Sequence, residues 1–275
     1  MTRLAILSVL LLLCGCHPPA PPAPVSGGAA RRIVSLDYCA DQYVLKLVPR
    51  DHILALSSDA TRDFSYLAAE AKGIRQVPPR AEDVLLLHPD LVVRSYGGGP
   101  GIEAKLASLN IPVVQIGYAD DLNGVRRVMA DAARDLGQPQ RGAAALAEFD
   151  RRMAALPGKA GAHTALYTTP GGVSGGSGTM VDSILNAAGY RNYLTQPGWR
   201  PLPLEQLAYR RPDLIVAARF GPAGTYTDRW SAARHPIVDR ATATTPVVRV
   251  DGSVTACGAW FVLDAVEAIA HQGRR

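Results

Sequence analysis

The sequence lacks an apolar stretch long enough to stay in a membrane as a helix. Such a helix needs about 20 consecutive apolar residues, whereas the apolar run at residues 4–13 is shorter. A dense run of Lys and Arg is also missing, although 29 basic residues outnumber 24 acidic ones. These absences argue against a permanent membrane span and against nucleic acid as a partner.

Clustered metal ligands and phosphate-binding loops are missing as well. The six histidines are scattered at no metal-ligand spacing, which argues against a zinc site or capture of a bare metal ion. Two glycine-rich segments, 97–101 and 171–179, lack the Lys-Ser/Thr ending of a P-loop. We expect no metal site, no nucleotide site and no resident cofactor.

Residues 1–16 have the pattern of an export signal. Arg3 precedes the apolar run, which ends in Leu13-Cys14-Gly15-Cys16. This ending resembles the bacterial lipobox, in which the Cys is acylated and becomes the new N-terminus, so Cys16 is the expected lipid anchor. The alternative is an ordinary signal peptide that is cut nearby, for example after Ala20.

Residues 17–31 predict a tether, because they are rich in Pro and Ala and have no apolar periodicity. The remainder is long enough for one large or two modest domains. With 48% hydrophobic and 19% charged residues in the whole chain, it is expected to be globular.

The four cysteines separate by compartment. Cys14 leaves with the signal and Cys16 is the lipidation candidate, so Cys39 and Cys257 remain in an oxidising space. A disulfide between them is one interpretation. Two buried thiols, or two thiols that act as soft metal ligands, are the alternatives.

Short β-branched runs alternate with amphipathic helical patterns, which predicts an α/β fold with largely parallel sheets. The expected strands are 32–36, 53–56, 91–94, 113–116, 164–167, 214–217 and 247–250. The expected helices are 40–47, 81–87, 102–109, 122–136, 180–188, 204–209 and 259–270.

Two segments of the chain match each other, 82–93 and 205–216. Each begins with Glu, continues as a helical pattern to Pro-Asp and ends in a buried strand. The offset is constant, since 205 minus 82 and 212 minus 89 both give 123. The repeat predicts two similar lobes.

A single amphipathic helix is predicted between the lobes, over residues 141–156. Leu146, Phe149, Met153 and Leu156 fall on one face, and Pro157 follows. At about 24 Å it could join two lobes across a cleft. The expected division is an N-terminal lobe at 32–138, an inter-lobe helix at 139–158 and a C-terminal lobe at 159–275.

The segment 32–39, the paired Pro-Asp-Leu strands, the joining helix and the lipoprotein start together resemble substrate-binding proteins of iron-siderophore and vitamin B12 ABC importers. The resemblance implies two Rossmann-like lobes with largely parallel sheets bridged by one long helix. It also implies capture of a metal chelate, a ferric siderophore or a corrinoid, in the cleft between the lobes. We accordingly expect a monomer, lipid-anchored in the periplasm or on the outer face of the cell membrane, that delivers this ligand to a permease dimer with its ATPase.

The same resemblance implies that Glu82 and Glu205, one in each lobe, dock the permease. Both also suit the first turn of a helix, where an acid is favourable in any case.

Strand ends and neighbouring turns supply the candidates for ligand contact, because ligands lie beyond the carboxyl ends of strands in open α/β sheets. Aromatic faces with a few arginines suit a large, flat or partly anionic ligand. The candidates are Asp37, Tyr38, Arg94, Tyr96, Tyr167, Trp199, Arg219 and Trp260, with Phe220 and Arg200 beside them.

One pattern favours an enzyme instead. Residues 172–176 fit the G-x-S-x-G of an α/β hydrolase with Ser174 as nucleophile, and His271 follows. In that motif, however, the helix starts right after the serine, whereas three glycines and another serine intervene here. His271 also lies close to the last residue. We therefore expect a binding protein and keep the hydrolase as the alternative.

Overall fold

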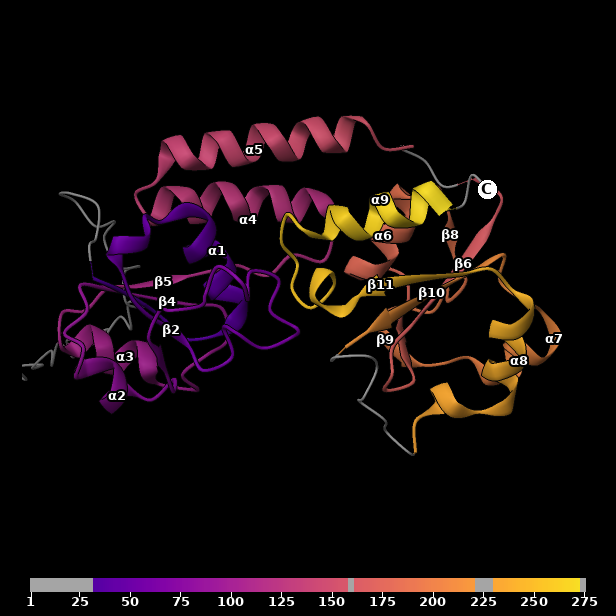
Figure 1. Ribbon diagram of the computed structural model, residues 1–275, viewed down its shortest axis with the longest axis horizontal. Helices are drawn as coiled ribbons and strands as arrows, with labels where there is room; N and C mark the ends of the chain where they lie inside the picture. The colour runs from indigo at the N-terminus through magenta and orange to yellow at the C-terminus, as the bar shows by residue number, and fades with distance from the viewer. Residues whose placement is uncertain (1–31, 158–160, 221–229, 273–275) are drawn as a thin grey trace, which may run out of the picture.

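The computed structural model of the protein describes residues 32–157, 161–220 and 230–272. Figure 1 shows two lobes side by side, each built around its own sheet. Nearly all strand pairs are parallel. The predicted fold class, two α/β lobes with largely parallel sheets, is confirmed.

The first lobe has a five-stranded parallel sheet in the order β3-β2-β1-β4-β5. Its central strand β1 is completely buried, as expected for a strand covered on both faces. The elements are β1 (Ile33–Ser35), α1 (Tyr38–Leu47), η1 (Arg50–His52), β2 (Ile53–Ser57), β3 (Gln76–Val77), α2 (Ala81–Leu85), β4 (Leu91–Arg94), α3 (Ile102–Ser108), β5 (Val113–Gln115) and α4 (Leu122–Asp135).

The second lobe has a four-stranded parallel sheet in the order β11-β10-β6-β8 and a separate antiparallel ribbon, β7-β9. The sequence did not predict this ribbon. The elements are β6 (Thr164–Thr168), β7 (Val173–Gly175), α6 (Met180–Ala187), β8 (Arg191–Asn192), β9 (Trp199–Pro201), α7 (Leu204–Tyr209), β10 (Leu214–Arg219), η3 (Ala232–Arg234), α8 (Pro236–Thr244), β11 (Val247–Asp251), η4 (Gly252–Val254) and α9 (Val262–Gln272).

Helix α5 (Pro139–Ala154) lies on α4 and extends toward the second lobe (Figure 1). It begins with Pro139, a favourable first residue. A Cβ added at Gly142 would stand 2.2 Å from the Cβ of Ala133, so glycine lets the two helices approach closely. At the other end, Arg152 forms ion pairs of 2.6 and 2.8 Å with Asp264 and Glu267 of α9. The helix thus contacts both lobes.

The two lobes also share one hydrophobic core. The segment before α9 packs against α1, where the rings of Tyr43 and Trp260 meet edge to face at 5.5 Å. Tyr66, in the long turn segment after β2, stacks on Phe261 at 4.4 Å and donates to Asp264 Oδ2 at 2.7 Å. These contacts fix the position of one lobe against the other.

In the described ranges, none of the helices combines the length and the apolar character required to cross a bilayer.

Candidate functional site: an aromatic cleft between the lobes

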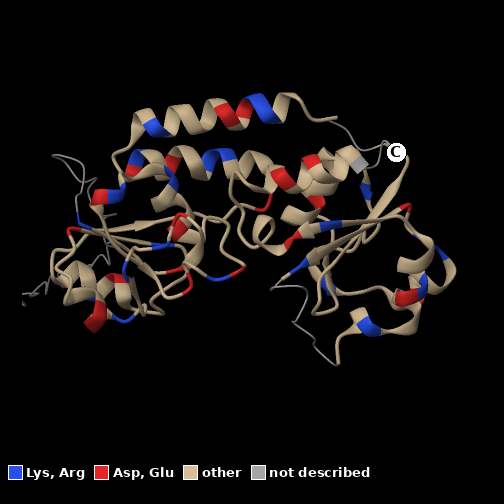
Figure 2. Cartoon of the chain, in the orientation of Figure 1, with Lys and Arg blue, Asp and Glu red and all other residues tan. Residues whose placement is uncertain are grey.

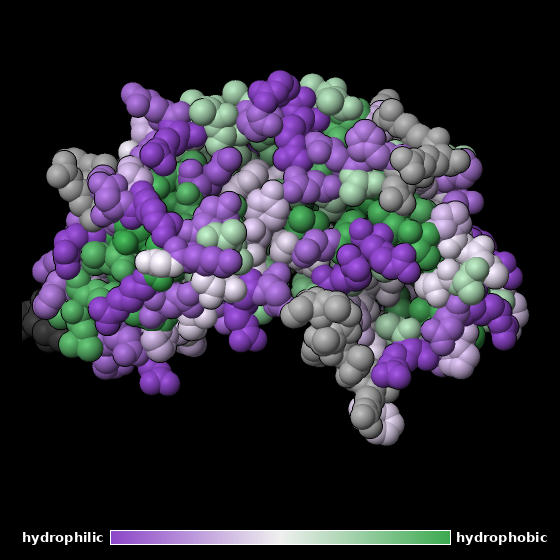
Figure 3. Space-filling model, viewed as in Figure 1, coloured by the Kyte–Doolittle hydropathy of each residue, from purple (hydrophilic) through white to green (hydrophobic). Residues whose placement is uncertain are grey.

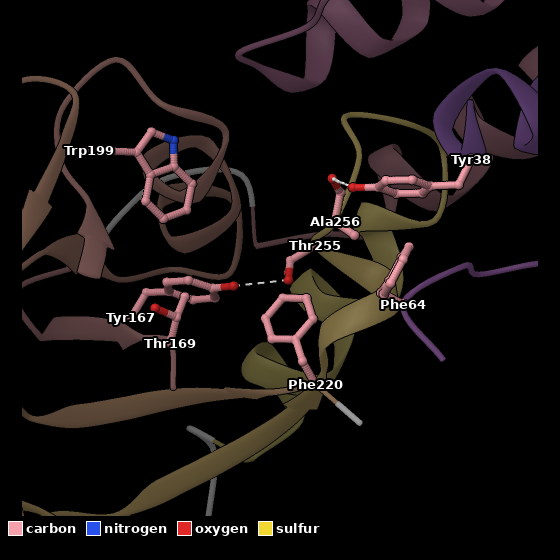
Figure 4. Close-up of a pocket in the computed structure, with 8 residues that line it drawn as sticks. All are labelled: Tyr38, Phe64, Tyr167, Thr169, Trp199, Phe220, Thr255 and Ala256. Atoms are coloured by element: carbon pink, nitrogen blue, oxygen red, sulfur yellow. Dashed lines mark hydrogen bonds between the residues drawn. The ribbon is translucent and has the colours of Figure 1, made fainter. Parts of the chain in front are cut away.

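A cavity of about 400 Å³ lies between the lobes. Figure 4 shows aromatic side chains on both sides of it, with Tyr38 and Phe64 from the first lobe facing Trp199 from the second. The complete lining is Tyr38, Phe64, Tyr167, Thr169, Trp199, Phe220, Thr255 and Ala256. Five of these eight residues are aromatic, so the cavity mainly offers ring faces and edges.

Strand ends position most of this lining. Tyr38 begins α1 just after β1, Tyr167 lies near the end of β6, and Phe220 directly follows β10. The carboxyl ends of parallel strands form one edge of a sheet, which is where ligands bind in open α/β folds. Trp199 comes instead from β9 of the antiparallel ribbon.

The buried Asp37 connects two segments on the first-lobe side of the cleft, the start of α1 and the loop after β4. Its Oδ1 caps α1 by accepting from Ala40 N at 2.9 Å. Its Oδ2 accepts from the backbone N–H groups of Ser95, Tyr96 and Gly97 at 2.7, 3.0 and 2.9 Å. The carboxylate is 3% exposed, so it positions the loop that carries Tyr96 and presents no free oxygen to the cleft.

Tyr38 and Tyr96 form a pair at this edge. Their rings meet edge to face at 5.9 Å. Tyr38 also donates to Ala256 O of the second lobe at 3.3 Å. Burial is the main cause that raises the pKa of both phenols, so both stay neutral near pH 7.

On the opposite side, Tyr167 forms the back of the cavity and Trp199 forms its accessible wall. The Tyr167 hydroxyl lies 2.9 Å from Thr255 Oγ1, and burial raises the pKa of Tyr167 to about 12. Trp199 is 52% exposed, and its ring lies 6.3 Å from that of Tyr167. A large ligand can therefore contact the indole of Trp199. The buried Tyr167 supports the wall of the cavity behind it.

Three arginines neighbour residues of the aromatic lining, Arg62 in space and Arg200 and Arg219 in sequence. The guanidinium carbon of Arg62 lies 6.0 Å from the Phe64 ring centre. Arg219 is exposed at the end of β10, next to Phe220, and Arg200 follows Trp199. Figure 2 shows backbone positions of Lys and Arg, in blue, near the gap between the lobes. Peripheral acidic groups of a ligand could pair with these cations.

The structure brings some of the predicted ligand residues together and separates others. Tyr38, Tyr167 and Trp199 line the cavity, Tyr96 contacts Tyr38, and Arg219 directly precedes the lining residue Phe220 in sequence.

Two predicted residues take up positions behind the cleft. Arg94 donates to Glu103 at 2.6 Å and to Tyr96 O at 3.3 Å, and its buried Nε has no partner. Trp260 is 8% exposed and packs on Tyr43. Lys46 Nζ lies 5.6 Å from the centre of its ring.

Sequence reasoning missed four lining residues: Phe64, Thr169, Thr255 and Ala256. Phe64 lies in a segment of consecutive turns, between β2 and β3, where no strand or helix pattern pointed to the cleft. Thr255 and Ala256 stand immediately before Cys257, in the turn region that follows β11. The signal that could have found them is their place between that strand and Trp260, which was a predicted ligand residue.

A disulfide joins Cys39 of α1 to Cys257 of the second lobe, with the Cα atoms 5.8 Å apart. Its cysteines are adjacent in sequence to Tyr38 and Ala256, both of which line the cavity. The predicted pairing is thus present. Bonded in this way, the two sulfurs are neither free thiols nor thiolate metal ligands.

Ser174 has none of the surroundings of a nucleophile. It lies in β7 of the antiparallel ribbon, is 0% exposed, and its Oγ has no hydrogen-bond partner. A hydrolase nucleophile stands on an exposed strand-to-helix turn beside a base. The described ranges also contain no group of three or more His, Cys, Asp or Glu that could hold a metal ion.

Glu82 and Glu205 lie at the starts of α2 and α7, on the surfaces of the two lobes. Glu82 accepts from Lys105 Nζ at 2.9 Å, and this interaction lowers the pKa of Glu82. Cys16 and the tether lie outside the described residues.

The fold and the inter-lobe cleft define a class of two-lobed solute-binding proteins. The chain belongs to the periplasmic binding protein family, whose pattern matches residues 33–234. Proteins of this family are substrate-binding components of transport systems.

Among curated proteins, a "Cobalamin-binding protein" of Halobacterium salinarum is 28% identical over 221 residues. The match covers 75% of this chain and 57% of that relative, so the chain spans little more than half of the relative's length.

Solved structures with the same fold include the periplasmic heme-binding protein HutB of Vibrio cholerae. That protein has a TM-score of 0.71 and 20% identity, with 89% of this chain and 99% of that chain covered. The vitamin B12-binding protein BtuF of Vibrio cholerae has a TM-score of 0.65 and 19% identity, with 88% and 96% covered. At these identities the likeness establishes the fold.

Proposed function

We propose that this chain captures a bulky metal chelate, a corrinoid in the first instance, in the aromatic cleft and delivers it to an ABC permease. The observation that carries the proposal is the cavity lined by aromatic residues from both lobes. Ring faces bind flat, partly apolar ligands, and the cavity is of the size that small-molecule sites have. The relative named as cobalamin-binding supports the choice of a corrinoid.

In this proposal the metal arrives inside its organic chelator. The lining consists of phenol, phenyl, indole, hydroxyl and methyl groups, with no carboxylate or imidazole to coordinate an ion. Trp199, Tyr38 and Tyr96 contact the macrocycle, Tyr167 supports the wall, and Arg219 meets peripheral acidic groups. Asp37 and Arg94 hold the backbone of Tyr96 in place, and Trp260 packs on Tyr43 of α1.

The experiment that tests the ligand is a titration of the purified protein with cyanocobalamin, haemin and a ferric siderophore. We expect cyanocobalamin to change Trp fluorescence with saturation. Substitution Trp199→Ala should weaken that binding by about tenfold, the loss expected for one aromatic contact. Lack of saturable binding by all three compounds would disprove the proposal, and unchanged affinity in the Trp199→Ala variant would contradict the placement of the ligand.

We further propose that the protein carries its ligand without transforming it. The buried Ser174 supports this, since a substrate cannot reach its hydroxyl. A generic ester assay on the same sample, compared with Ser174→Ala, should give only background hydrolysis in both proteins. Turnover that disappears in the variant would restore the hydrolase alternative.

The export and anchoring of the chain are proposed on sequence alone. Acylation of Cys16 holds a monomer at a membrane surface in the periplasm or outside the cell membrane, with lobes at 32–138 and 159–275 joined by 139–158. Substitution Cys16→Ala should release the protein from membranes and remove the lipid mass. A variant that keeps the modified mass and still sediments with membranes would refute the anchor.

The proposed docking sites are Glu82 and Glu205, which meet arginines of a permease dimer that works with its ATPase. Their support is the equivalent placement of the two exposed carboxylates, each at the start of a short helix in its own lobe.

A further inference from the structure

The 123-residue repeat extends beyond the two glutamates into the exposed side chains of α2 and α7. Val84 and Leu207 are equivalent, since 207 minus 84 is 123, and both are buried in the lobe cores. Leu86 and Tyr209 are equivalent by the same difference, and they are 75% and 93% exposed. Each lobe therefore buries one apolar residue of this short helix and exposes another at the matching place, Leu86 as the C-cap residue of α2 and Tyr209 as the last residue of α7.

The exposed apolar side chain lies one helical turn after the carboxylate in both lobes. Leu86 N donates to Glu82 O at 3.2 Å, which closes a helical turn. Glu205 and Tyr209 are four residues apart within α7. Residues four apart share a helix face, so each lobe presents a carboxylate and an apolar group side by side.

The two helices lie far apart on the molecule. Figure 1 shows α2 and α7 toward the outer ends of the two lobes, remote from α5. The hydropathy view in Figure 3 shows a mixed surface on which apolar residues appear among polar ones. Neither lobe covers the exposed group of the other.

A single exposed apolar residue is ordinary on a protein surface and needs no explanation. A pair at repeated positions, each beside a glutamate, points to a partner that offers the same surface twice. A two-fold symmetric dimer does so. Large apolar side chains that are buried in an interface usually contribute more to affinity than charges at its rim.

We infer that Leu86 with Glu82, and Tyr209 with Glu205, form two docking knobs that insert into equivalent sockets on the permease dimer, each socket an apolar hollow beside a guanidinium group. The inference rests on the proposed function and adds the apolar half of the contact. The glutamates steer the encounter and orient the complex, and burial of Leu86 and Tyr209 supplies most of its affinity.

The two knobs contribute unequally. Tyr209 is the larger and more exposed side chain. On the first lobe, Glu82 is already paired with Lys105 at 2.9 Å, so docking must replace that ion pair. We expect the second lobe to contribute more of the affinity than the first.

Site-specific photo-crosslinking tests the inference in cells that contain the full chain and its own importer. The photoreactive residue p-benzoylphenylalanine replaces Leu86 or Tyr209, and crosslinked products are identified by mass spectrometry. Both positions should capture the same polytopic membrane protein, because the proposed partner is a dimer of identical subunits. The control position is Ala147, which is exposed on α5 away from both knobs. Two different partners, no membrane partner, or equal crosslinking at Ala147 would overturn the inference.

Uptake of cyanocobalamin, haemin and ferrichrome supplies the second readout. Tyr209→Ala should lower uptake at least tenfold, Leu86→Ala less, and Tyr209→Phe least, because the phenyl ring keeps most of the apolar contact. Normal uptake in the Tyr209→Ala variant would refute the knob. If the parent protein binds none of the three compounds, the proposed function fails, whereas the crosslinks still report whether the knobs dock.

Discussion

Asp37 shows how one buried carboxylate organises the edge of the cleft. It accepts four backbone hydrogen bonds, one from Ala40 in α1 and three from the loop after β4. Gly97 allows this approach, since a Cβ there would stand 2.4 Å from Leu36 O. The strand-end position predicted that Asp37 contacts the ligand. In the structure its carboxylate oxygens already accept hydrogen bonds from the backbone, so Asp37 positions the loop instead.

Substitution Asp37→Ala should therefore lower the free energy of unfolding by about 3 kcal/mol, from the lost cap and the unpaired loop N–H groups. Displacement of Tyr96 should also weaken chelate binding. Urea denaturation and ligand titration measure the two effects. Asp37→Asn serves as the control: it keeps an acceptor for some of these donors and should lose less. Equal stability of the parent and Asp37→Ala would contradict this account.

Asp41 provides a test of pH dependence. It is 0% exposed, and Ser57 donates to it through N at 3.1 Å and Oγ at 2.6 Å. Burial dominates over these hydrogen bonds and raises the pKa of Asp41 from 3.8 to about 6. Between these pH values the folded state binds a proton that the unfolded state has released. The contribution to stability is thus present below pH 3.8 and is lost as the pH rises through about 6.

We expect the contribution of Asp41 to fall by about 3 kcal/mol across this window. Other groups titrate there too, so the comparison is with Asp41→Asn, which cannot ionise. Urea denaturation at a series of pH values should show a steeper loss of stability with rising pH in the parent than in the variant. Parallel curves would mean that Asp41 titrates at the same pH in the folded and unfolded protein.

At the scale of elements, the lobes are joined by three independent kinds of contact. Helix α5 packs on α4 and pairs through Arg152 with α9. The segment before α9 packs its aromatic residues on α1. The Cys39–Cys257 disulfide then closes a loop of 218 residues in sequence separation.

Removal of that disulfide by Cys39→Ser with Cys257→Ser should lower the free energy of unfolding by about 5 kcal/mol, the loop-entropy value for so long a separation. Urea denaturation with and without reductant measures it. Reductant should destabilise the parent by a similar amount and leave the double variant unchanged. If reductant acts equally on both proteins, its effect does not come from this bond.

At the scale of the whole molecule, the two glutamates proposed to dock the permease lie one on each lobe. We expect Glu82→Lys with Glu205→Lys to leave chelate affinity within about threefold, less than 1 kcal/mol, since neither residue lines the cavity. Uptake should nevertheless collapse, because like charges across an interface cost several kcal/mol. Single reversals should give intermediate losses. Normal uptake in the double variant would remove the docking role, and lost chelate binding would mean that the residues act on the cleft.

The sequence predicted the framework of this protein because its signals are local. Buried strands such as β1 and β10 appear as short apolar runs, and the ends of α2 and α7 follow from Pro-Asp after a helical pattern. The repeat at 123 residues predicted two similar lobes, and the compartment suggested a disulfide between Cys39 and Cys257. The apolar runs and the Pro-Asp stops are patterns of residues close together in the chain. The repeat depends on a constant sequence offset, and the disulfide on the number of cysteines left after export.

Only the tertiary structure decided which strand-end residues face the cleft. Asp37 meets its three loop donors across 58 to 60 positions of sequence, and Arg94 is held by Glu103 and the Tyr96 carbonyl. Phe64 reaches the cavity from a segment of turns, and Trp199 from a ribbon without a sequence signal. The direction of a side chain depends on partners that folding brings near, so composition and periodicity identify the candidates, and three-dimensional packing selects among them.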